Sequence, residues 1–344
     1  MQSCLKNPPD LRPGSMIRSQ ANCYQLQEYL DSGVYGTVMK CQNLTAQRPS
    51  VLKVLRIQNA GDRWQEEVKI LQILAQHQGH NKPIVQWFHS FQASGHFIHE
   101  FERLDISLKQ FVTQSPNKSL GLREIRPIVS QMAHALSFLK ALGIMHNDVK
   151  LDNIMLVDHL RKPLSVKLID FGLASTEKCQ GREIQSRAFR APEVFLGAPV
   201  DSAADMWALG IVAVSMFLGR FPLPGHSDED MMRHIVETVG HCPAAVMDSG
   251  LYTIMYYSLS SSGKWEYMFT PLKPEQKVLH RLDDMDRNDR SGRAAVYIEP
   301  RDRHAFVHLV KEMLDPNPAT RITPAAVMSH PFVSMRHLVR GNQC

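Results

Sequence analysis

The chain has 344 residues, of which 44% are hydrophobic and 21% charged, so it can bury the core of one large fold or of two ordinary domains. These fractions exclude wholesale disorder, and the scattered basic residues, with a net charge of +5, lack the basic stripe of a nucleic-acid surface. The six cysteines are widely separated and form no C-x-x-C pair, which argues against a zinc site or a disulfide framework.

The first 23 residues are rich in proline, glycine and polar residues and show no periodicity, which predicts a flexible leader. They contain no apolar run with a cleavage site, so no signal peptide is indicated and an intracellular protein is expected. The longest apolar run, 206–218, is too short to span a bilayer and is expected to form a buried core helix. We therefore expect no membrane association.

Short runs rich in Val, Leu or Tyr extend from residue 24 to 53 and predict consecutive antiparallel strands. Between the first two runs, residues 31–38 read D-S-G-V-Y-G-T-V, in which Gly33 and Gly36 would let the backbone approach a phosphate closely. Two glycines in a hairpin also mark a simple turn, and the segment alone does not separate these two interpretations.

Lys53 lies inside a strand-like run with Val and Leu on both sides, where an unpaired ammonium would be very costly. Residues 63–75 carry apolar side chains at helical spacing, which places Glu67 beside the buried stripe. We expect Glu67 to pair with Lys53. The alternative is an exposed glutamate on a solvated face.

Strand-like runs end near Leu104, and helical patterns dominate the rest of the chain. The helix expected at 125–142 stops at Gly143, and the loop at 146–153 follows, reading H-N-D-V-K-L-D-N. The order predicts an α+β fold with a small β-rich lobe containing one main helix and a larger helical lobe. The loop falls where the two lobes would meet, a position that ligands favour.

The loop 146–153 offers an acid/base carboxylate in Asp148, a cation in Lys150 and an amide oxygen in Asn153. The sequence I-D-F-G follows at 169–172 and places Asp170 where it could share a magnesium ion with Asn153. Phosphoryl transfer needs such groups because it depends on positioning and on neutralising oxygen charge more than on covalent chemistry.

With these elements in this order, residues 24–339 resemble a eukaryotic protein kinase, including A-P-E at 191–193 and D-M-W-A-L-G at 205–210. Finer features resemble the homeodomain-interacting protein kinase family, near the dual-specificity tyrosine-regulated kinases. They include F-E-R-L-D-I-S-L-K-Q-F at 101–111 and I-Q-S-R-A-F-R-A-P-E at 184–193. The resemblance implies a bilobal fold.

The kinase resemblance also implies domain boundaries. The N-lobe is expected at about 24–104 and the C-lobe at about 105–339, with a short tail at 340–344. A group-specific insert at about 241–301, polar and broken by Gly and Pro, is expected to be a docking surface.

The resemblance implies ATP and Mg²⁺ as cofactors. Lys53, held by Glu67, would bridge the α- and β-phosphates, while Asn153 and Asp170 would hold magnesium. Asp148 would orient the substrate hydroxyl and accept its proton, and Lys150 would offset charge on the transferred group.

The resemblance also implies an adenine pocket. Phe101 would be its gatekeeper, Glu102 and Leu104 would bond adenine through their backbones, and Val38 with Met155 would sandwich the base. The expected ATP contacts are Leu30, Gly33, Gly36, Val38, Val51, Lys53, Phe101, Glu102, Leu104, Asp105 and Met155. Structural roles are expected for His146, Phe171, Glu193, Asp205 and Arg321, with Glu193 and Arg321 as a buried ion pair.

Two residues depart from the kinase pattern above the nucleotide. Asp31 replaces the first of three glycines and would place a negative charge near the triphosphate. Val51 replaces an alanine, and its extra methyl groups would narrow the adenine pocket. The alternative function is therefore a pseudokinase that binds partners without catalysis, against which stands the intact set Lys53, Glu67, Asp148, Asn153 and Asp170.

Four residues bear on regulation. Asn147 replaces the arginine that normally pairs with a phosphorylated activation loop, and Glu183 stands where the family has an autophosphorylated tyrosine. Near Arg187 and Arg190, Glu183 would supply a permanent but weaker charge. The alternative is a solvated surface glutamate. Arg187 matches the arginine of proline-directed kinases, which predicts phosphorylation of Ser or Thr followed by Pro.

The resemblance further implies protein substrates, with transcription regulators among them, and autophosphorylation of dual specificity. It implies residence in the nucleus, the cytoplasm or both, although no basic run forms a clear import signal. Direct nucleic-acid binding is not expected.

Overall fold

The computed structural model describes residues 11–33, 36–56, 63–77, 82–115, 117–176, 179–273, 277–287 and 300–339. They divide into two compact units, of which the first ends at Asp105 and the second begins at Ile106. The predicted tail at 340–344 and the first ten residues of the predicted leader lie outside the described residues.

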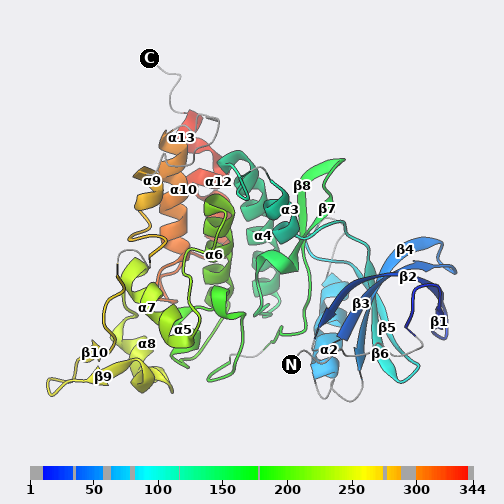
Figure 1. Ribbon diagram of the computed structural model, residues 1–344, viewed down its shortest axis with the longest axis horizontal. Helices are drawn as coiled ribbons and strands as arrows, with labels where there is room; N and C mark the ends of the chain where they lie inside the picture. Colours follow the sequence, from blue (N-terminus) through cyan, green and yellow to red (C-terminus); the bar gives the residue numbers. More distant parts are fainter. Residues whose placement is uncertain are drawn as a thin grey trace. The chain divides into compact units, whose positions relative to one another are not determined.

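The first unit is built on an antiparallel six-stranded sheet with strand order β1-β2-β3-β4-β6-β5 (Figure 1). Side chains alternate between the core and the other face along β3, so Met39 and Cys41 are buried. The strands are β1 (Met16–Arg18), β2 (Cys23–Gly33), β3 (Gly36–Asn43), β4 (Arg48–Arg56), β5 (Trp87–Ala93) and β6 (His96–Glu102).

The sheet begins earlier than the sequence predicts. Composition predicts a flexible leader through residue 23, but β1 pairs with β2, and Leu11 and Ile17 are only 2% and 3% exposed. The Tyr29 hydroxyl donates a hydrogen bond to the Leu11 carbonyl. Because polar residues surround these two apolar residues in the sequence, no hydrophobic periodicity indicates that they are buried. The described part of the predicted leader is therefore a component of the first core.

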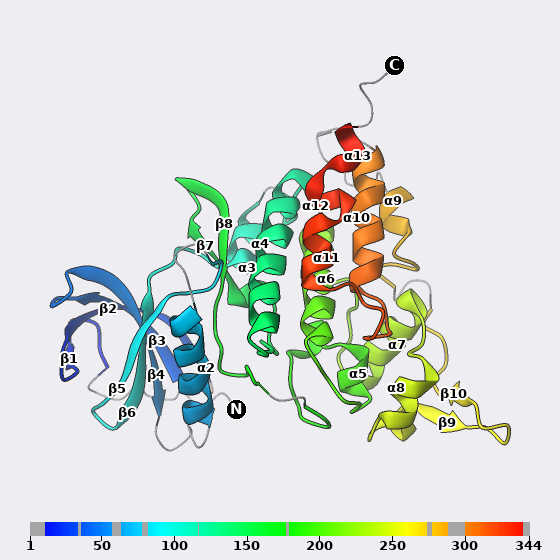
Figure 2. The same ribbon diagram turned by 180° about the vertical axis from the view of Figure 1, so that it is seen from behind.

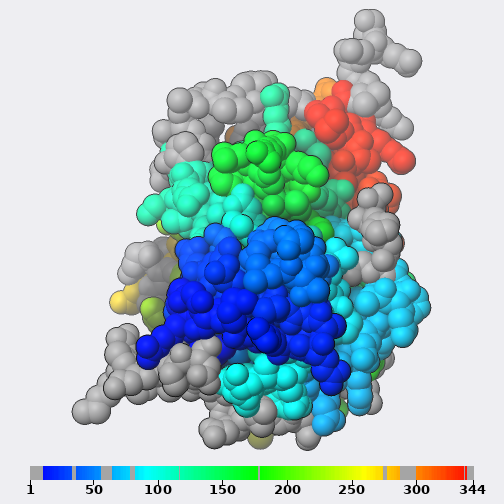
Figure 3. All heavy atoms as spheres, turned by 90° about the vertical axis from the view of Figure 1, so that its right-hand side faces the viewer, coloured from blue at the N-terminus to red at the C-terminus, as the bar shows by residue number. Residues whose placement is uncertain are grey.

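Helix α2 (Arg63–His77) packs on the sheet of the first unit (Figure 2). Its buried residues Ile70, Leu71 and Leu74 recur at helical spacing, and the Trp64 ring stacks on Phe97 with centroids 4.5 Å apart. Residues of the first four strands, drawn in blue, cover much of the face of this unit that Figure 3 turns toward the viewer.

The second unit is mainly helical and is organised around α6, on which α4 and α10 pack (Figures 1 and 2). As expected from its apolar run, α6 is buried continuously from Ala204 to Phe217. The longer helices are α3 (Leu108–Gln114), α4 (Leu122–Ala141), α6 (Ala203–Leu218), α7 (Asp228–Val239) and α10 (Pro300–Met313). Shorter ones are α5 (Pro192–Phe195), α8 (Ala244–Ser249), α9 (Asp284–Arg287), α11 (Pro324–Ser329), α12 (Pro331–Ser334) and α13 (Arg336–Val339).

Among the described residues of the second unit there are also two β-hairpins and three 3₁₀ turns. The hairpin of β7 and β8 packs on α4 and follows the loop 146–153, while the hairpin of β9 and β10 lies in the predicted insert. Parts of the insert, including 288–299, lie outside the described residues. The strands are β7 (Ile154–Asp158), β8 (Lys162–Leu168), β9 (Tyr257–Leu259) and β10 (Trp265–Tyr267), and the turns are η1 (Leu151–Asn153), η2 (Arg187–Phe189) and η3 (Thr253–Met255).

The described cysteines are mostly buried. Cys41, Cys179 and Cys242 lie in the interior of their units, whereas Cys23, at the start of β2, is half-exposed. Burial raises the pKa of the Cys41 and Cys242 thiols to about 12. Within the described ranges, no helix is both long and apolar enough to cross a membrane.

Candidate active site

The loop 146–153 is held by a buried carboxylate from the first turn of α6. Asp205 accepts hydrogen bonds from the backbone N–H groups of His146 at 2.8 Å and Asn147 at 2.9 Å. Burial raises the pKa of Asp205, although His146 and these N–H groups oppose the rise. Asn147 has a φ of 63°, an uncommon backbone conformation that these contacts fix. Asp205 therefore sets the loop's conformation, the structural role expected for it.

Asp148 lies at the centre of a cluster of hydrogen bonds in this loop. Its Oδ2 accepts from Lys150 Nζ at 2.7 Å and Asn153 Nδ2 at 2.9 Å, while its Oδ1 accepts from Ser186 Oγ at 2.9 Å. Lys150 Nζ also donates to Ser186 Oγ at 3.1 Å. Asp148 is only 7% exposed, so both carboxylate oxygens are oriented by neighbours within the second unit. A carboxylate so fixed can orient a hydroxyl and accept its proton.

Ser186 is a site residue that the motif spacing did not single out. It is 38 residues from Asp148 in the sequence, just before η2. Ser186 belongs to the run I-Q-S-R-A-F-R-A-P-E at 184–193. This run indicates a kinase subfamily but does not indicate that the serine contacts Asp148. The Ser186 hydroxyl joins the segment before α5 to the carboxylate of the loop.

The two expected magnesium ligands lie at the same end of the β7–β8 hairpin. Ile154 pairs with Leu168, and the Ile169 N–H donates to the Asn153 carbonyl at 2.9 Å, so Asp170 follows directly. Both amide N–H groups of Asn153 point to Asp148, to its carbonyl and its Oδ2, each at 2.9 Å. This orientation makes Asn153 Oδ1 the atom that can coordinate a cation. An amide and a carboxylate oxygen are the hard donors that Mg²⁺ prefers, so these residues fit the ion.

His146 and Phe171 support this end of the hairpin. The His146 ring contacts Phe171 edge-on with centroids 5.0 Å apart, and its Nε2 lies 3.0 Å from the Ile169 carbonyl. Both side chains are almost fully buried. They link the loop to the segment that carries Asp170.

In the first unit, Lys53 and Glu67 form the ion pair expected from the sequence. Lys53 Nζ on β4 lies 2.7 Å from Glu67 Oε1 on α2, and Glu67 is 4% exposed. The other carboxylate oxygen of Glu67 lies 3.6 Å from His99 Nε2, and the His99 ring stacks on Trp64 at 4.0 Å. The lysine is thus held in a defined position by a charge that is itself fixed on α2.

Four of the expected adenine residues of the first unit, Val38, Val51, Phe101 and Glu102, lie on the strands β3, β4 and β6 around Lys53. Val38 lies opposite Lys53, and Val51 lies opposite Phe101, whose side chain is 8% exposed. The N–H of Glu102 donates to the Gln86 carbonyl at 2.9 Å. The backbone group of Glu102 that is left to form a hydrogen bond with adenine is therefore its carbonyl.

The remaining expected adenine contacts differ in their exposure. Leu104 is buried, whereas Asp105 is exposed and Leu30 is 49% exposed. Met155 belongs to the second unit, where it forms a bridge to Ser107.

Gly36 is required by the sheet itself. A Cβ at this position would lie 2.2 Å from the Val54 carbonyl oxygen, so a larger residue would push β3 away from β4. Gly33 pairs with Gly36, while Val34 and Tyr35 lie outside the described residues. Asp31 lies on β2, exposed, and its Oδ1 accepts from the Ser32 N–H at 2.8 Å. This close packing gives a structural reason for Gly36 that is independent of a phosphate.

The predicted regulatory arginines share one carboxylate that the sequence did not indicate. Asp228, in the first turn of α7, lies 2.7 Å from Arg187 Nε and 3.3 Å from Arg190 Nη1. Glu183 is 89% exposed, and its Oε1 is 3.6 Å from Arg190 Nη2. Glu183 therefore contacts Arg190 at the edge of the cluster, whereas Arg187 forms an ion pair with Asp228.

Asn147 is buried and joins the loop to the segment that follows Asp170. Its Nδ2 donates to the Leu173 carbonyl and to Ser175 Oγ, both at 3.0 Å, and it is 1% exposed. A neutral side chain here makes these contacts without needing a charged partner.

Glu193 and Arg321 form the expected buried ion pair. Arg321 Nη1 and Nη2 lie 2.6 and 2.9 Å from the two oxygens of Glu193, and both side chains are at most 1% exposed. Arg321 Nη1 also donates to the Ala203 carbonyl at 2.9 Å. This bidentate contact ties α5 to the segment before α11.

The chain matches the protein kinase domain family over residues 24–333. It is 35% identical to homeodomain-interacting protein kinase 2 of Mesocricetus auratus, over 94% of this chain and 29% of that protein. It is also 35% identical to homeodomain-interacting protein kinase 1 of Mus musculus, over 94% of this chain and 28% of that protein. With homeodomain-interacting protein kinase 4 of Homo sapiens it shares 31% identity, over 94% of this chain and 57% of the relative.

The chain thus spans less than a third of the first two relatives and rather more than half of the third. The similarity covers both units, the Lys53–Glu67 pair and the cluster around Asp148. The chain belongs to the protein kinase family and resembles the homeodomain-interacting protein kinases across its kinase domain.

Proposed function

We propose that this protein is an ATP-dependent serine/threonine kinase that transfers the γ-phosphoryl group of ATP to hydroxyl groups of proteins. The cluster around Asp148 carries the proposal, because Lys150, Asn153 and Ser186 orient both oxygens of one buried carboxylate. A protein that only binds partners has no chemical need for that arrangement.

In the proposed reaction, Asp148 accepts a hydrogen bond from the substrate hydroxyl and takes its proton as the oxygen attacks the γ-phosphorus. Lys150 offsets negative charge on the transferred group. Lys53 binds the α- and β-phosphates, and Glu67 keeps the ammonium in place. Mg²⁺, when bound by Asn153 and Asp170, supplies neutralisation of charge on the phosphate oxygens.

Phosphate incorporation into a generic basic protein tests this activity. We expect the parent to transfer phosphate and Asp148→Asn to lose at least about a hundredfold in kcat, because the amide cannot accept the proton. Asp152→Asn is the matched control, since Asp152 is a neighbouring surface residue whose ion pair with Lys109 is solvent-exposed. A parent without incorporation, or Asp148→Asn as active as the control, would overturn the proposal.

We further propose that the kinase is active without activation-loop phosphorylation. The uncharged Asn147 already bonds to Leu173 and Ser175, and Glu183 lies beside Arg190 where a phosphorylated tyrosine would bring charge. Material treated with phosphatase should therefore keep its turnover. A large loss of activity after treatment contradicts constitutive activity but leaves the kinase assignment intact.

A preference for Ser or Thr followed by Pro is proposed from Arg187. Its guanidinium is fixed by Asp228 and by the His226 carbonyl at 3.1 Å, as a specificity pocket requires. A peptide library varied at the position after the phosphoacceptor should show enrichment of proline. A flat profile there refutes this specificity.

The second candidate is a pseudokinase, favoured by the charge of Asp31 and the bulk of Val51. It predicts a weak or absent thermal shift with Mg²⁺ and ATP. If Asp31 opposes the triphosphate, Asp31→Gly should increase the shift and lower KM for ATP. Nucleotide binding without transfer by the parent would favour this candidate.

Our proposals for the substrates and the location of this protein rest on the names of its relatives. The relatives are named for interaction with homeodomain proteins, so we propose transcription regulators as substrates of this chain, in the nucleus or cytoplasm. A recombinant homeodomain protein with a Ser-Pro site should be phosphorylated faster than its Ala-Pro variant. Equal incorporation into both would argue against it.

A further inference from the structure

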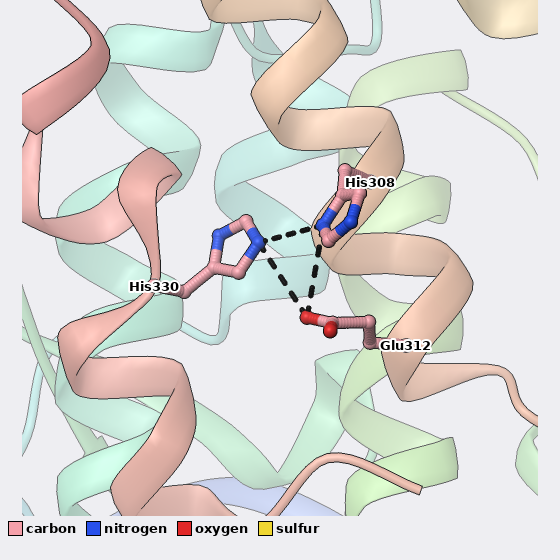
Figure 4. A group of neighbouring side chains, drawn as sticks. All are labelled: His308, Glu312 and His330. Carbon is pink, nitrogen blue, oxygen red and sulfur yellow. Dashed lines mark hydrogen bonds and ion pairs between the residues drawn. The ribbon is translucent and has the colours of Figure 1, made fainter.

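A group of two histidines and one glutamate lies in the second unit, outside the residues of the proposed reaction. His308 and Glu312 project from α10 toward His330, which precedes α12 (Figure 4). Helices α10 and α12 pack on each other near the C-terminal end of the described chain, and this packing brings the three donors together. The cysteine spacing, which argued against zinc, carried no information about such a site.

The three donor atoms have the spacing of a metal site. His308 Nδ1 lies 3.0 Å from His330 Nε2, His330 Nε2 lies 3.5 Å from Glu312 Oε2, and His308 Nδ1 lies 3.8 Å from that oxygen. A triangle with these sides has a centre about 2.0 Å from each corner, the length of a zinc–nitrogen or zinc–oxygen bond. An ion can therefore contact all three without moving the helices.

Glu312 supplies a second observation that points to a ligand. Its Oε2 is shielded from solvent and has no hydrogen-bond donor among the described residues, although the two histidine nitrogens lie nearby. A shielded carboxylate oxygen is costly without a strong partner. A divalent cation at the centre of the triangle would provide one.

A cavity of about 710 Å³ borders the site and leaves room for a further ligand. His308 and His330 line it, together with His304, one turn earlier on α10, and Asp286 of α9. His304 Nδ1 lies 3.4 Å from Asp286 Oδ2. A water molecule or His304 could complete four-coordination. Arg301 lines the same cavity, and its charge opposes a cation, which limits the affinity.

We propose that His308, Glu312 and His330 form a zinc-binding site that joins α10 to the start of α12. Two imidazole nitrogens and one carboxylate oxygen suit Zn²⁺ better than Mg²⁺ or Ca²⁺, which take oxygen ligands. The site is structural, because it lies on two packed helices and contains none of the residues assigned to phosphoryl transfer.

Zinc binding competes with two existing hydrogen bonds of His330, one at each ring nitrogen. His330 Nδ1 lies 3.1 Å from the Phe332 N–H and accepts its hydrogen bond, so the neutral ring carries its proton on Nε2. Coordination through Nε2 moves the proton to Nδ1 and breaks this cap, which weakens binding by about 2- to 30-fold. Without metal, His330 Nε2 donates instead to His308 Nδ1. The site is therefore expected to bind zinc more weakly than a site of the same three donors without these competing hydrogen bonds.

Titration of the chain with Zn²⁺ after chelation tests the proposal. The parent should bind one ion at the site, and Co²⁺ in its place should show the intense visible absorption of a tetrahedral complex. His308→Gln and Glu312→Gln should each weaken Zn²⁺ binding at least tenfold. These two positions are partly exposed, so the variants are expected to fold, whereas His330 is 6% exposed and is left unchanged.

Two controls locate the ion. His280→Gln changes an exposed histidine elsewhere in the second unit, and Asp170→Asn removes a proposed magnesium ligand. Both should bind Zn²⁺ like the parent. Equal binding by the parent and the His308→Gln variant, or loss of binding in Asp170→Asn alone, overturns the site. Either result would show that the three side chains form only a hydrogen-bonded cluster.

Discussion

Ser186 connects two segments that are distant in the sequence, and this connection is what orients Asp148. Its hydroxyl donates to Asp148 Oδ1 and accepts from Lys150 Nζ, so a single oxygen bridges the carboxylate and the ammonium. Lys150 also contacts Asp148 Oδ2 directly at 2.7 Å, so without Ser186 it is the other oxygen, Oδ1, that would be less constrained.

Replacing Ser186 by alanine should lower kcat about 10- to 100-fold, because a hydrogen bond to a charged group contributes about 1.5–3 kcal/mol. KM for ATP should change little, since the nucleotide is assigned to other residues. Steady-state kinetics would measure both parameters. Ser186→Thr keeps the hydroxyl and should restore most of kcat. A fall in kcat that threonine does not restore would indicate a folding defect instead, because a smaller active fraction lowers apparent kcat and leaves KM unchanged.

Substitution of Glu183 tests whether its permanent charge replaces that of a phosphorylated activation loop. Glu183→Gln should lower turnover about 2- to 5-fold, the effect of losing one solvent-exposed ion pair, here the one with Arg190. Turnover by phosphatase-treated protein is the measurement. Glu266→Gln, on the exposed position of β10, is the control. Unchanged turnover in Glu183→Gln would show that Glu183 is a solvated surface residue.

Local spacing predicted the reactive side chains but not the groups that hold them. Asp148, Lys150 and Asn153 lie within six residues, and Lys53 on β4 is 14 residues from Glu67 on α2. Ser186 and Asp228 are 36 or more residues from the groups they bind. No periodicity marks such partners, because only the fold brings them together.

At the scale of elements, the sheet of the first unit encloses a buried carboxylate on β6. Glu100 is fully buried and accepts hydrogen bonds from Tyr24 at 2.8 Å, Ser50 at 2.6 Å and Asn43 at 3.1 Å. Burial opposes its ionisation, but these bonds and the charge of Arg48 together hold the pKa of Glu100 below its usual value.

The Glu100 network makes the first unit sensitive to acid through His89, whose Nδ1 lies 3.2 Å from Glu100 Oε2. Burial lowers the pKa of His89 below its ordinary 6.5, and this effect is larger than the rise that the charge of Glu100 causes. The unfolded chain therefore binds more protons as pH falls through about 6.5, and stability decreases. The lowered pKa of Glu100 adds a further loss of stability as pH falls below about 4.5.

Urea denaturation at pH 7.5 and 5.5 would measure this effect. The parent should lose stability on acidification, and His89→Gln should reduce that loss by at most about 1 kcal/mol. His77→Gln, at an exposed position of α2, should behave like the parent. If the two variants show the same pH dependence, His89 is not the responsible group.

The elements themselves show why part of the fold escaped prediction. Strand β1 has three residues and one buried side chain, too few for an alternating pattern to appear, and Leu11 lies in a Pro- and Gly-rich stretch. The apolar run of α6 and the alternation in β3 are long enough to be recognised. The network around Glu100 joins residues of β2, β3, β4, β5 and β6 and could not be predicted from any one of these strands.

At the scale of the whole molecule, the Glu193–Arg321 pair spans 128 residues of the second unit and is fully desolvated. Removing one partner leaves an uncompensated buried charge. Arg321 also lies over the Trp207 ring at 5.3 Å, so the pair is part of the core around α6.

Arg321→Met should destabilise the second unit by about 3–5 kcal/mol, measured by denaturant unfolding. The double variant Glu193→Leu with Arg321→Met should lose less, because no charge is then left unpaired. Lys311→Met is the matched control, since its ion pair with Asp283 is about half-exposed on both sides and should contribute at most about 1 kcal/mol. A double variant less stable than Arg321→Met would contradict this account.

The burial of the thiols has a practical consequence for electrophilic probes. Cys41 and Cys242, with pKa values of about 12, remain protonated at neutral pH and should resist alkylation. Cys23 is half-exposed on β2. With Cys4 and Cys344 replaced by serine, a maleimide fluorophore on Cys23 would report on the first unit. With Trp64 and Trp87 of the first unit replaced by phenylalanine, tryptophan fluorescence would report on the second unit. The two units of one kinase chain could then be followed separately in a single unfolding experiment.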